Sequence, residues 1–349
     1  MFKKINIQRF RCFDNFTITN LTRVNLIAGK NSVGKTTLLE AIFLLLGAGN
    51  ISLAIKISGF RGLADFKGDI ETIIQMLWTP LFHNLDISQK IIVTGDMNNN
   101  KGQYGVELFL QSAESQPISL KDTTYQNNIY NKKLILRYKE LTKPVTEFEM
   151  AWINGQLAVK PSPTSVPFPG FFYSTRSYNP SEDAELFGNL VKTKRSFNLV
   201  KILKIVDDRL TDLTTIQSAG TPMIYGDIGL EQLLPISLLG DGMSRLNAIL
   251  LRIANATGGV VLIDEVENGF HYSLQKDVWK AIGEAAQTFN TQVFITTHSY
   301  ETIKTANEAF SGNRDFSYHR LDRIKDKIEA INYKGEELNS ALESDFEVR

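Results

Sequence analysis

One segment of the chain, residues 29–36, constrains the fold more than any other. It reads Gly-Lys-Asn-Ser-Val-Gly-Lys-Thr and lies between an apolar run, Val24–Ala28, and a run with helical spacing, Leu38–Leu46. This is the pattern of a phosphate-binding loop, in which glycines between a strand and a helix let backbone N–H groups curl around phosphates. A glycine turn can also simply cap a helix, so the interpretation needs a second motif.

The residues of this loop have distinct expected roles. Lys35 is placed to reach the β and γ oxygens of a nucleotide, and Thr36 offers a hydroxyl to Mg²⁺. We therefore expect ATP and Mg²⁺ as the bound cofactors. The residues expected to surround the nucleotide here are Gly29, Lys30, Asn31, Ser32, Val33, Gly34, Lys35, Thr36 and Thr37.

A second motif supports the first. The apolar run Val260–Ile263 ends in Asp264 and Glu265, and a phosphate-binding loop needs a carboxylate at a buried strand end beside its Mg²⁺. Asp264 is expected to serve the metal, and Glu265 to polarise the attacking water. Strand-end acids also cap helices, but the two motifs in the expected order favour the catalytic interpretation.

A histidine ends a third apolar run. The segment Thr-Thr-His-Ser at 296–299 places His298 level with the two acids, where it could hydrogen-bond a γ-phosphate or hold the water. A lone histidine is more often a structural residue, yet this position favours function. The predicted catalytic residues are therefore Lys35, Glu265 and His298.

The order of the expected elements indicates an α/β fold. Strands and helices alternate from residue 260 onward, which implies a mostly parallel sheet covered by helices on both faces. Residues 51–170 instead show short alternating segments between Asn, Gly and Lys turns, as in an antiparallel β-rich lobe, and a Pro-rich connector at 161–170 ends it. We predict a head formed by residues 1–50 and 171–349, with an inserted strand-rich lobe at 51–170.

Charge and cysteine content bear on partners and compartment. The 349 residues carry 38 basic and 38 acidic side chains, a formal net charge of zero, which weakens the case for extended contact with nucleic acid. Cys12 is the only cysteine, so a disulfide within the chain is excluded and a reducing cytoplasm is expected. No apolar run is long enough to span a bilayer, and we expect no membrane contact.

With these motifs the chain resembles the ABC-type ATPase superfamily, in the branch of SMC, RecF and OLD-type proteins. The similarity lies in Gly-Lys-Asn-x-x-Gly-Lys-Thr-Thr-Leu-Leu-Glu-Ala-Ile, in Ile-Asp-Glu-Val-Glu-Asn-Gly-Phe-His, in Thr-Thr-His-Ser and in the opening Ile-x-x-Phe-Arg-x-Phe. The resemblance implies a P-loop NTPase fold of ABC-ATPase type. It also implies that ATP is hydrolysed in a head-to-tail homodimer or higher homo-oligomer.

The resemblance includes a signature segment, residues 239–245, which in this superfamily contacts the γ-phosphate of ATP held by a second subunit. The segment departs from the usual Leu-Ser-Gly-Gly-Gln, because Gly240 replaces the serine and Asp241 replaces a glycine. Gly242 at the helix N-terminus and Arg245 could still supply positive potential. Alternatively, Asp241 is only an N-cap.

Two further positions follow from the resemblance. Asn268 lies where the superfamily has its D-loop, which crosses the dimer interface. Arg11 matches an arginine close to the nucleotide, although a surface salt bridge explains it equally well. No Q-loop glutamine is identified, and residues 172–176 occupy the corresponding strand end.

The resemblance also bears on the biological role. The chain has neither a long coiled coil between its halves nor an Asp-x-Asp pair after His298. It therefore resembles stand-alone ATPase subunits of bacterial antiphage and abortive-infection systems, which regulate a separate effector such as a TOPRIM-like nuclease. The alternative is a RecF- or SMC-like ATPase that binds DNA in repair or replication. A stripe of basic residues could serve DNA or could be a solvated strand face, namely Lys132, Lys133, Arg137 and Lys139.

Overall fold

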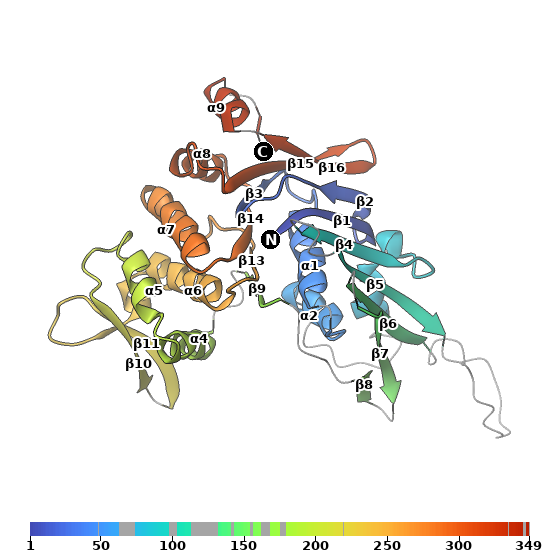
Figure 1. Ribbon diagram of the computed structural model, residues 1–349, viewed down its shortest axis with the longest axis horizontal. Coiled ribbons are helices and arrows are strands. Elements are labelled where there is room, and N and C mark those ends of the chain that lie inside the picture. The colour runs from blue at the N-terminus through green and yellow to red at the C-terminus, as the bar shows by residue number, and fades with distance from the viewer. Residues whose placement is uncertain are drawn as a thin grey trace.

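The computed structural model contains two large sheets that share a central helix (Figure 1). It describes residues 1–47, 49–62, 74–97, 103–112, 132–140, 143–153, 156–161, 168–174, 179–218, 220–333, 335–344 and 347–348. The predicted Pro-rich connector falls largely outside the described residues, because residues 162–167 are not among them.

The core sheet has six strands in the order β16-β15-β3-β14-β13-β9. Its strands are β3 (Val24–Ala28), β9 (Gly170–Tyr173), β13 (Val260–Ile263), β14 (Gln292–Thr296), β15 (Phe316–Ile324) and β16 (Lys327–Tyr333). All neighbours pair in parallel except β15 and β16, which form an antiparallel hairpin at one edge. The predicted, mostly parallel sheet is confirmed.

Helices cover both faces of this sheet (Figure 1). They include α1 (Lys35–Leu46), α6 (Asp241–Asn255), α7 (Gln275–Thr288) and α8 (Tyr300–Ala309). Alternate residues of β13 serve the two faces: Val261 and Ile263 join a core with α6 and α7, whereas Val260 and Leu262 join a second core with α1. The strand is therefore apolar throughout, because neither face meets water.

The second sheet has seven strands in the order β2-β1-β4-β5-β6-β7-β8, and every neighbouring pair is antiparallel. Its strands are β1 (Phe2–Phe10), β2 (Phe13–Ile18), β4 (Ile91–Met97), β5 (Gln103–Ser112), β6 (Lys132–Glu140), β7 (Thr146–Ile153) and β8 (Gln156–Lys160). The predicted antiparallel strands are thus present, but they extend a sheet begun by β1 and β2 instead of forming a sheet of their own. The division at residues 50 and 170 stays a prediction.

A smaller unit lies beside α6. It contains α4 (Pro180–Lys192), α5 (Ser196–Leu203) and a three-stranded sheet of β10 (Asp212–Ser218), β11 (Thr221–Asp227) and β12 (Leu234–Pro235). The helices α4 and α5 are separated by a short break, where Lys194 has a left-handed φ of 57°. A non-glycine residue in that conformation ends a helix, and no glycine or proline signals it in the sequence.

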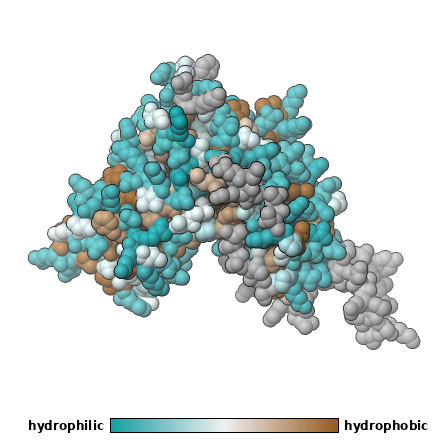
Figure 2. Space-filling view, viewed as in Figure 1, coloured by the Kyte–Doolittle hydropathy of each residue, from teal (hydrophilic) through white to brown (hydrophobic). Residues whose placement is uncertain are grey.

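The remaining described elements are short. They are α2 (Leu53–Phe60), α9 (Gly335–Glu343), η1 (Ile74–Trp78), η2 (Thr79–Leu81), η3 (His83–Leu85), η4 (Ile236–Leu239) and η5 (Tyr272–Leu274). Among the described residues, no helix has both the length and the apolar composition needed to cross a membrane. Hydrophilic residues cover most of the described surface in the view of Figure 2, with small hydrophobic patches between them.

Candidate nucleotide-binding site

The loop after β3 has the backbone of an anion cradle. Gly29 and Gly34 have φ values of 150° and 100°. A Cβ atom on Gly29 would lie 2.6 Å from the carbonyl oxygen of Leu321, and one on Gly34 would lie 2.9 Å from Sγ of Cys12. Gly34 is also the N-cap of α1, and no side chain caps that helix. The start of α1 is therefore open to a phosphate, as the loop pattern requires.

A cavity of about 960 Å³ opens beside this loop. The predicted site residues that line it are Arg11, Asn31, Ser32, Gly34, Lys35, Thr36, Thr37, Asp264, Glu265 and His298. Gly29, Lys30, Asn31 and His298 line a neighbouring cavity of about 270 Å³ together with Glu347. The loop motif, more than 200 residues before the other two in the chain, thus meets them at the carboxyl ends of β3, β13 and β14.

Further residues that the sequence motifs did not identify also line the cavity. They are Cys12, Arg61, Pro80, Phe82, Asn84, Leu85 and Ser174. Ser174 follows β9 at the strand end that was compared with a Q-loop. Cys12 lies within the opening Ile-x-x-Phe-Arg-x-Phe segment, and the other five come from segments without a recognisable motif. A bridge between Phe10 and Phe82 and the ion pair of Arg61 with Glu40 help to place them.

Lys35 closes back over the loop from which it emerges. Its Nζ donates hydrogen bonds to the carbonyl oxygens of Gly29 and Lys30, at 2.6 and 3.0 Å. Burial lowers the pKa of Lys35, while the carboxylates of the cavity oppose that shift. The N–H groups of the Lys35 ammonium can therefore donate to phosphate oxygens in place of these two carbonyl oxygens.

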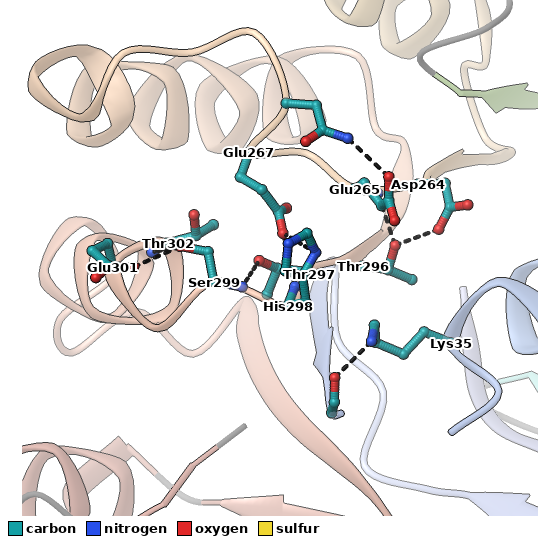
Figure 3. Close-up of polar contacts among 12 residues, drawn as sticks. Lys35, Asp264, Glu265, Glu267, Thr296, Thr297, His298, Ser299, Glu301 and Thr302 are labelled. Atoms are coloured by element: carbon teal, nitrogen blue, oxygen red, sulfur yellow. Dashed lines mark hydrogen bonds and ion pairs between the residues drawn. The ribbon is translucent and has the colours of Figure 1, made fainter. Parts of the chain in front are cut away.

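Asp264 is in direct contact with Thr36. On its other side Asp264 lies beside Thr296 (Figure 3). The Thr36 hydroxyl donates to Asp264 Oδ2 at 2.9 Å, and the Thr296 hydroxyl donates to Oδ1 at 2.6 Å. Burial raises the pKa of Asp264, and these two hydrogen bonds partly counter that shift. One hydroxyl and one carboxylate suit Mg²⁺, which takes few protein ligands and completes its shell with phosphates and water. The described residues contain no cluster of three or more His, Cys, Asp or Glu groups that could hold a metal ion.

Glu265 is held on three sides in an unusual conformation. Its φ is +52°, in the left-handed region. Its N–H donates to the Thr296 hydroxyl at 2.9 Å, and its Oε2 accepts from Asn268 Nδ2 at 2.8 Å. Its carbonyl oxygen accepts from Arg245 at 3.1 Å. Asn268 therefore contacts the acid of its own chain, and a role across a dimer interface stays a prediction.

His298 is paired with a residue that the motif analysis did not assign. Oε1 of Glu267 accepts from the backbone N–H of His298 at 2.8 Å and lies 2.9 Å from ring Nδ1 (Figure 3). The Glu267 side chain is only 9% exposed, whereas that of His298 is 47% exposed on the cavity wall. The third acid of the Asp-Glu-Val-Glu segment was the available signal for this pair.

Arg11 lines the cavity and also forms an ion pair, but not the surface pair considered as its alternative. Its Nε lies 3.1 Å from a carboxylate oxygen of Glu40, which is fully buried in α1. Arg61 pairs with the same carboxylate at 2.8 Å. Burial lowers the pKa of Arg11 to about 10. The buried carboxylate of Glu40 thus holds Arg11 beside the loop.

The signature segment lies apart from the cavity. Gly240, Gly242 and Arg245 are not among the residues that line it. Gly240, with a φ of 112°, is the N-cap of α6, and Asp241 is the first helical residue, so the interpretation of Asp241 as the N-cap is wrong. The N-terminus of α6 therefore does not line the cavity in which the other motifs meet.

The architecture and the cavity define the class of protein: a P-loop ATPase of the ABC type. A family described as "AAA domain" matches residues 4–214, more than half of the chain, and the chain belongs to this AAA-domain family. A second family, described as "AAA domain, putative AbiEii toxin, Type IV TA system", matches residues 151–304. The resemblance to ABC-type ATPases is thereby confirmed.

Individual relatives are distant. An "ATP/GTP phosphatase" of Helicobacter pylori is 22% identical over 384 residues, which cover 99% of each chain. An uncharacterized protein of Methanocaldococcus jannaschii is 43% identical over 58 residues, which cover 16% of this chain and 26% of that protein. The similarity to the first extends along the whole chain and is not confined to the motifs.

Solved structures of SMC head domains are similar to this chain at low sequence identity. The Smc head domain of Pyrococcus furiosus with an extended coiled coil, bound to the C-terminal domain of ScpA, matches with a TM-score of 0.50 and 13% identity, covering 99% of each chain. An SMC head domain of Thermotoga maritima matches with a TM-score of 0.45 and 12% identity, covering 95% of this chain and 99% of that one. At such identities the match concerns the fold alone.

Proposed function

We propose that the protein binds MgATP in the 960 Å³ cavity and hydrolyses it as a head-to-tail dimer or higher oligomer, and that this cycle regulates a separate effector protein in a bacterial antiphage or abortive-infection system. The observation that carries the ATPase proposal is the convergence of Lys35, Asp264 and Glu265 on one cavity. Loop, metal-associated acid and base are the parts that phosphoryl transfer to water needs.

Each group has a chemical task in this proposal. Lys35 leaves the loop carbonyls and donates to the phosphate oxygens, and Glu265 accepts the proton of the attacking water. His298 donates to the γ-phosphate or holds the water. Thr36 and Asp264 would hold Mg²⁺, which when bound neutralises charge on the β- and γ-phosphates. The loop residues Asn31, Ser32 and Thr37, with Arg11, surround the phosphates.

The dimer in this proposal concerns the donors that a second chain could add at the γ-phosphate. Charge that develops on the γ-phosphate is usually met by additional donors, worth about 10³- to 10⁵-fold in rate when a second protein supplies them. Gly240 and Gly242 at the N-terminus of α6 are outside their own chain's cavity. A head-to-tail pair would bring this helix N-terminus to the partner's nucleotide.

Two observations favour an effector over DNA as the partner. Residues 151–304 match a family whose description includes the AbiEii toxin, which supports a defence role. In the basic stripe on β6, Lys133 is paired with Glu149 and Arg137 with Glu147, at 3.0 and 2.6 Å. These pairs reduce the positive potential available to a phosphate backbone, so direct DNA binding is the weaker alternative.

Phosphate release by the purified protein with Mg²⁺ and ATP tests the proposal. We expect Lys35→Ala to lose ATP binding and Glu265→Gln to bind ATP without turning it over. Unchanged turnover in both variants would exclude the proposed site. Duplex DNA should leave the rate unchanged; a severalfold stimulation that falls steeply with salt would favour the RecF-like alternative instead.

A further inference from the structure

The side chain of Arg245 turns toward its own chain instead of outward. Its Nη2 donates to the carbonyl oxygen of Glu265 at 3.1 Å. The guanidinium carbon lies 5.7 Å from the ring centroid of Tyr173 and 5.8 Å from that of Phe270. An arginine that reaches a partner's phosphate would need to leave all three contacts.

The acceptor of that hydrogen bond is a strained residue. Glu265 has a φ of +52°, in the left-handed region that is unfavourable for a non-glycine residue. Such a conformation persists only where the surrounding contacts impose it. Thr296 binds the N–H of Glu265, Asn268 binds its carboxylate, and Arg245 binds its carbonyl oxygen. The carbonyl oxygen also accepts from the backbone N–H of Asn268 at 3.2 Å. Arg245 therefore ties the strained peptide to α6, whereas Asn268 ties it to the loop that follows.

The loop that follows the acids is shaped to accept this arginine. Gly269 has a φ of 86°, and a Cβ atom there would lie 3.2 Å from Cδ of Arg245. Nε of Arg245 is buried and has no acceptor among the described residues. A buried donor without a partner is unfavourable, so the position of the guanidinium is set by the carbonyl of Glu265 and the two rings and does not satisfy every donor.

We propose that Arg245 is a positioning residue that acts in cis: it holds Glu265 of its own chain in the left-handed conformation that presents the carboxylate to the nucleotide cavity. This inference rests on the proposed function, in which Glu265 is the base. It replaces, for Arg245 alone, the contact with a partner's ATP that the family resemblance implies. Gly240 and Gly242 keep that expected role.

Steady-state kinetics provide the first test. Arg245→Met keeps an apolar stem between the rings but removes the donors. We expect kcat to fall about ten- to a hundredfold, because a charge-assisted hydrogen bond is lost, while KM for ATP stays within about twofold. Arg245→Lys retains a donor and should recover part of kcat. Arg209→Met, at a 63% exposed position, is the matched control. A kcat for Arg245→Met within twofold of the parent would overturn the proposal.

Mixed subunits separate action in cis from action in trans. Lys35→Ala and Arg245→Met are mixed in equal amounts. If Arg245 acts in trans, each mixed dimer has one intact site, and the mixture reaches about a quarter of the parent rate. If it acts in cis, no site is intact, and the rate at equal total protein is the mean of the rates of the two separate variants. A mixture of Lys35→Ala with Glu265→Gln gives the baseline, since both residues lie in one cavity.

Failure of the inference and failure of the proposed function give different results. Light scattering of Glu265→Gln with MgATP reports whether a dimer forms. If the protein stays monomeric, the dimer is disproved, and a loss of kcat in Arg245→Met still supports positioning in cis. If Arg245→Met loses its circular dichroism signal, Arg245→Lys and Arg245→Gln undergo the same kinetic comparison, with Lys expected to retain more activity than Gln.

Discussion

A single oxygen of Glu267 holds His298 twice. Oε1 accepts the backbone N–H of the histidine at 2.8 Å and lies 2.9 Å from its ring Nδ1. A carboxylate in that place selects the tautomer with the proton on Nδ1, which leaves Nε2 as the nitrogen available to the cavity. The buried acid therefore sets both the position of the ring and the hydrogen-bonding character of its exposed nitrogen.

Removal of this acid should impair turnover more than binding. We expect Glu267→Ala to lower kcat about ten- to a hundredfold through loss of a charge-assisted hydrogen bond, with Glu267→Gln intermediate because an amide oxygen still accepts. Steady-state ATP hydrolysis measures both variants. Glu308→Gln, an exposed carboxylate on α8, serves as control. A Glu267→Ala enzyme with parental kcat would show that His298 needs no such support.

Thr296→Val should move the acid limb of activity to higher pH. Burial raises the pKa of Asp264, and the Thr296 hydroxyl lowers it. Without the hydroxyl, burial is less opposed, so Asp264 takes up its proton at a higher pH and activity is lost earlier on acidification. The pH–rate profile measures this shift. Thr297→Val removes a neighbouring buried hydroxyl that bonds Ser299 instead, and its acid limb should stay in place; equal profiles for both variants would contradict the assignment.

Glu40→Met should be strongly destabilising although it replaces a charged group by an apolar one. The carboxylate is fully buried and pairs with Arg11, whose side chain is 10% exposed. Removing one partner of a buried pair leaves a charge without compensation and costs about 3–5 kcal/mol. Urea unfolding measures the loss. The double variant Arg11→Met, Glu40→Met should regain part of it, and a single-variant loss below about 1 kcal/mol would rule out the buried pair as a structural element.

Mild acid should destabilise the core sheet through His319. This β15 residue is fully buried between Ser317 and Asn332, and burial lowers its pKa to about 4. In the unfolded chain His319 takes up its proton with a pKa near 6.5, whereas in the folded chain its pKa is about 4. Stability is therefore present above pH 6.5 and declines as pH falls through this window, by at most about 3 kcal/mol. Urea unfolding between pH 4 and 7 measures the decline, and His319→Gln should lack it; parallel curves for both would disprove the assignment.

The predictable parts of the fold were those with local signals. The strand Val260–Ile263 matches the structure residue for residue, because a continuous apolar run fits a parallel sheet covered on both faces. The break at Lys194 and the joining of β15 to β3 were not predictable. Lys194 adopts a left-handed conformation although it is not a glycine. The pairing of β15 with β3 joins segments almost 300 residues apart in the chain.

The sequence by itself determined the chemistry of the site: a glycine loop with its lysine and threonine, two acids after a buried strand and a histidine after the next. Residue type and spacing suffice there, because phosphate binding relies on the backbone of a short segment and on strand ends that a parallel sheet aligns at one edge. Only the tertiary structure decided which side chains act on those groups. Glu267 beside His298, Glu40 beneath Arg11 and Arg245 behind Glu265 depend on how loops and helices from distant segments pack, and no local pattern encodes such contacts.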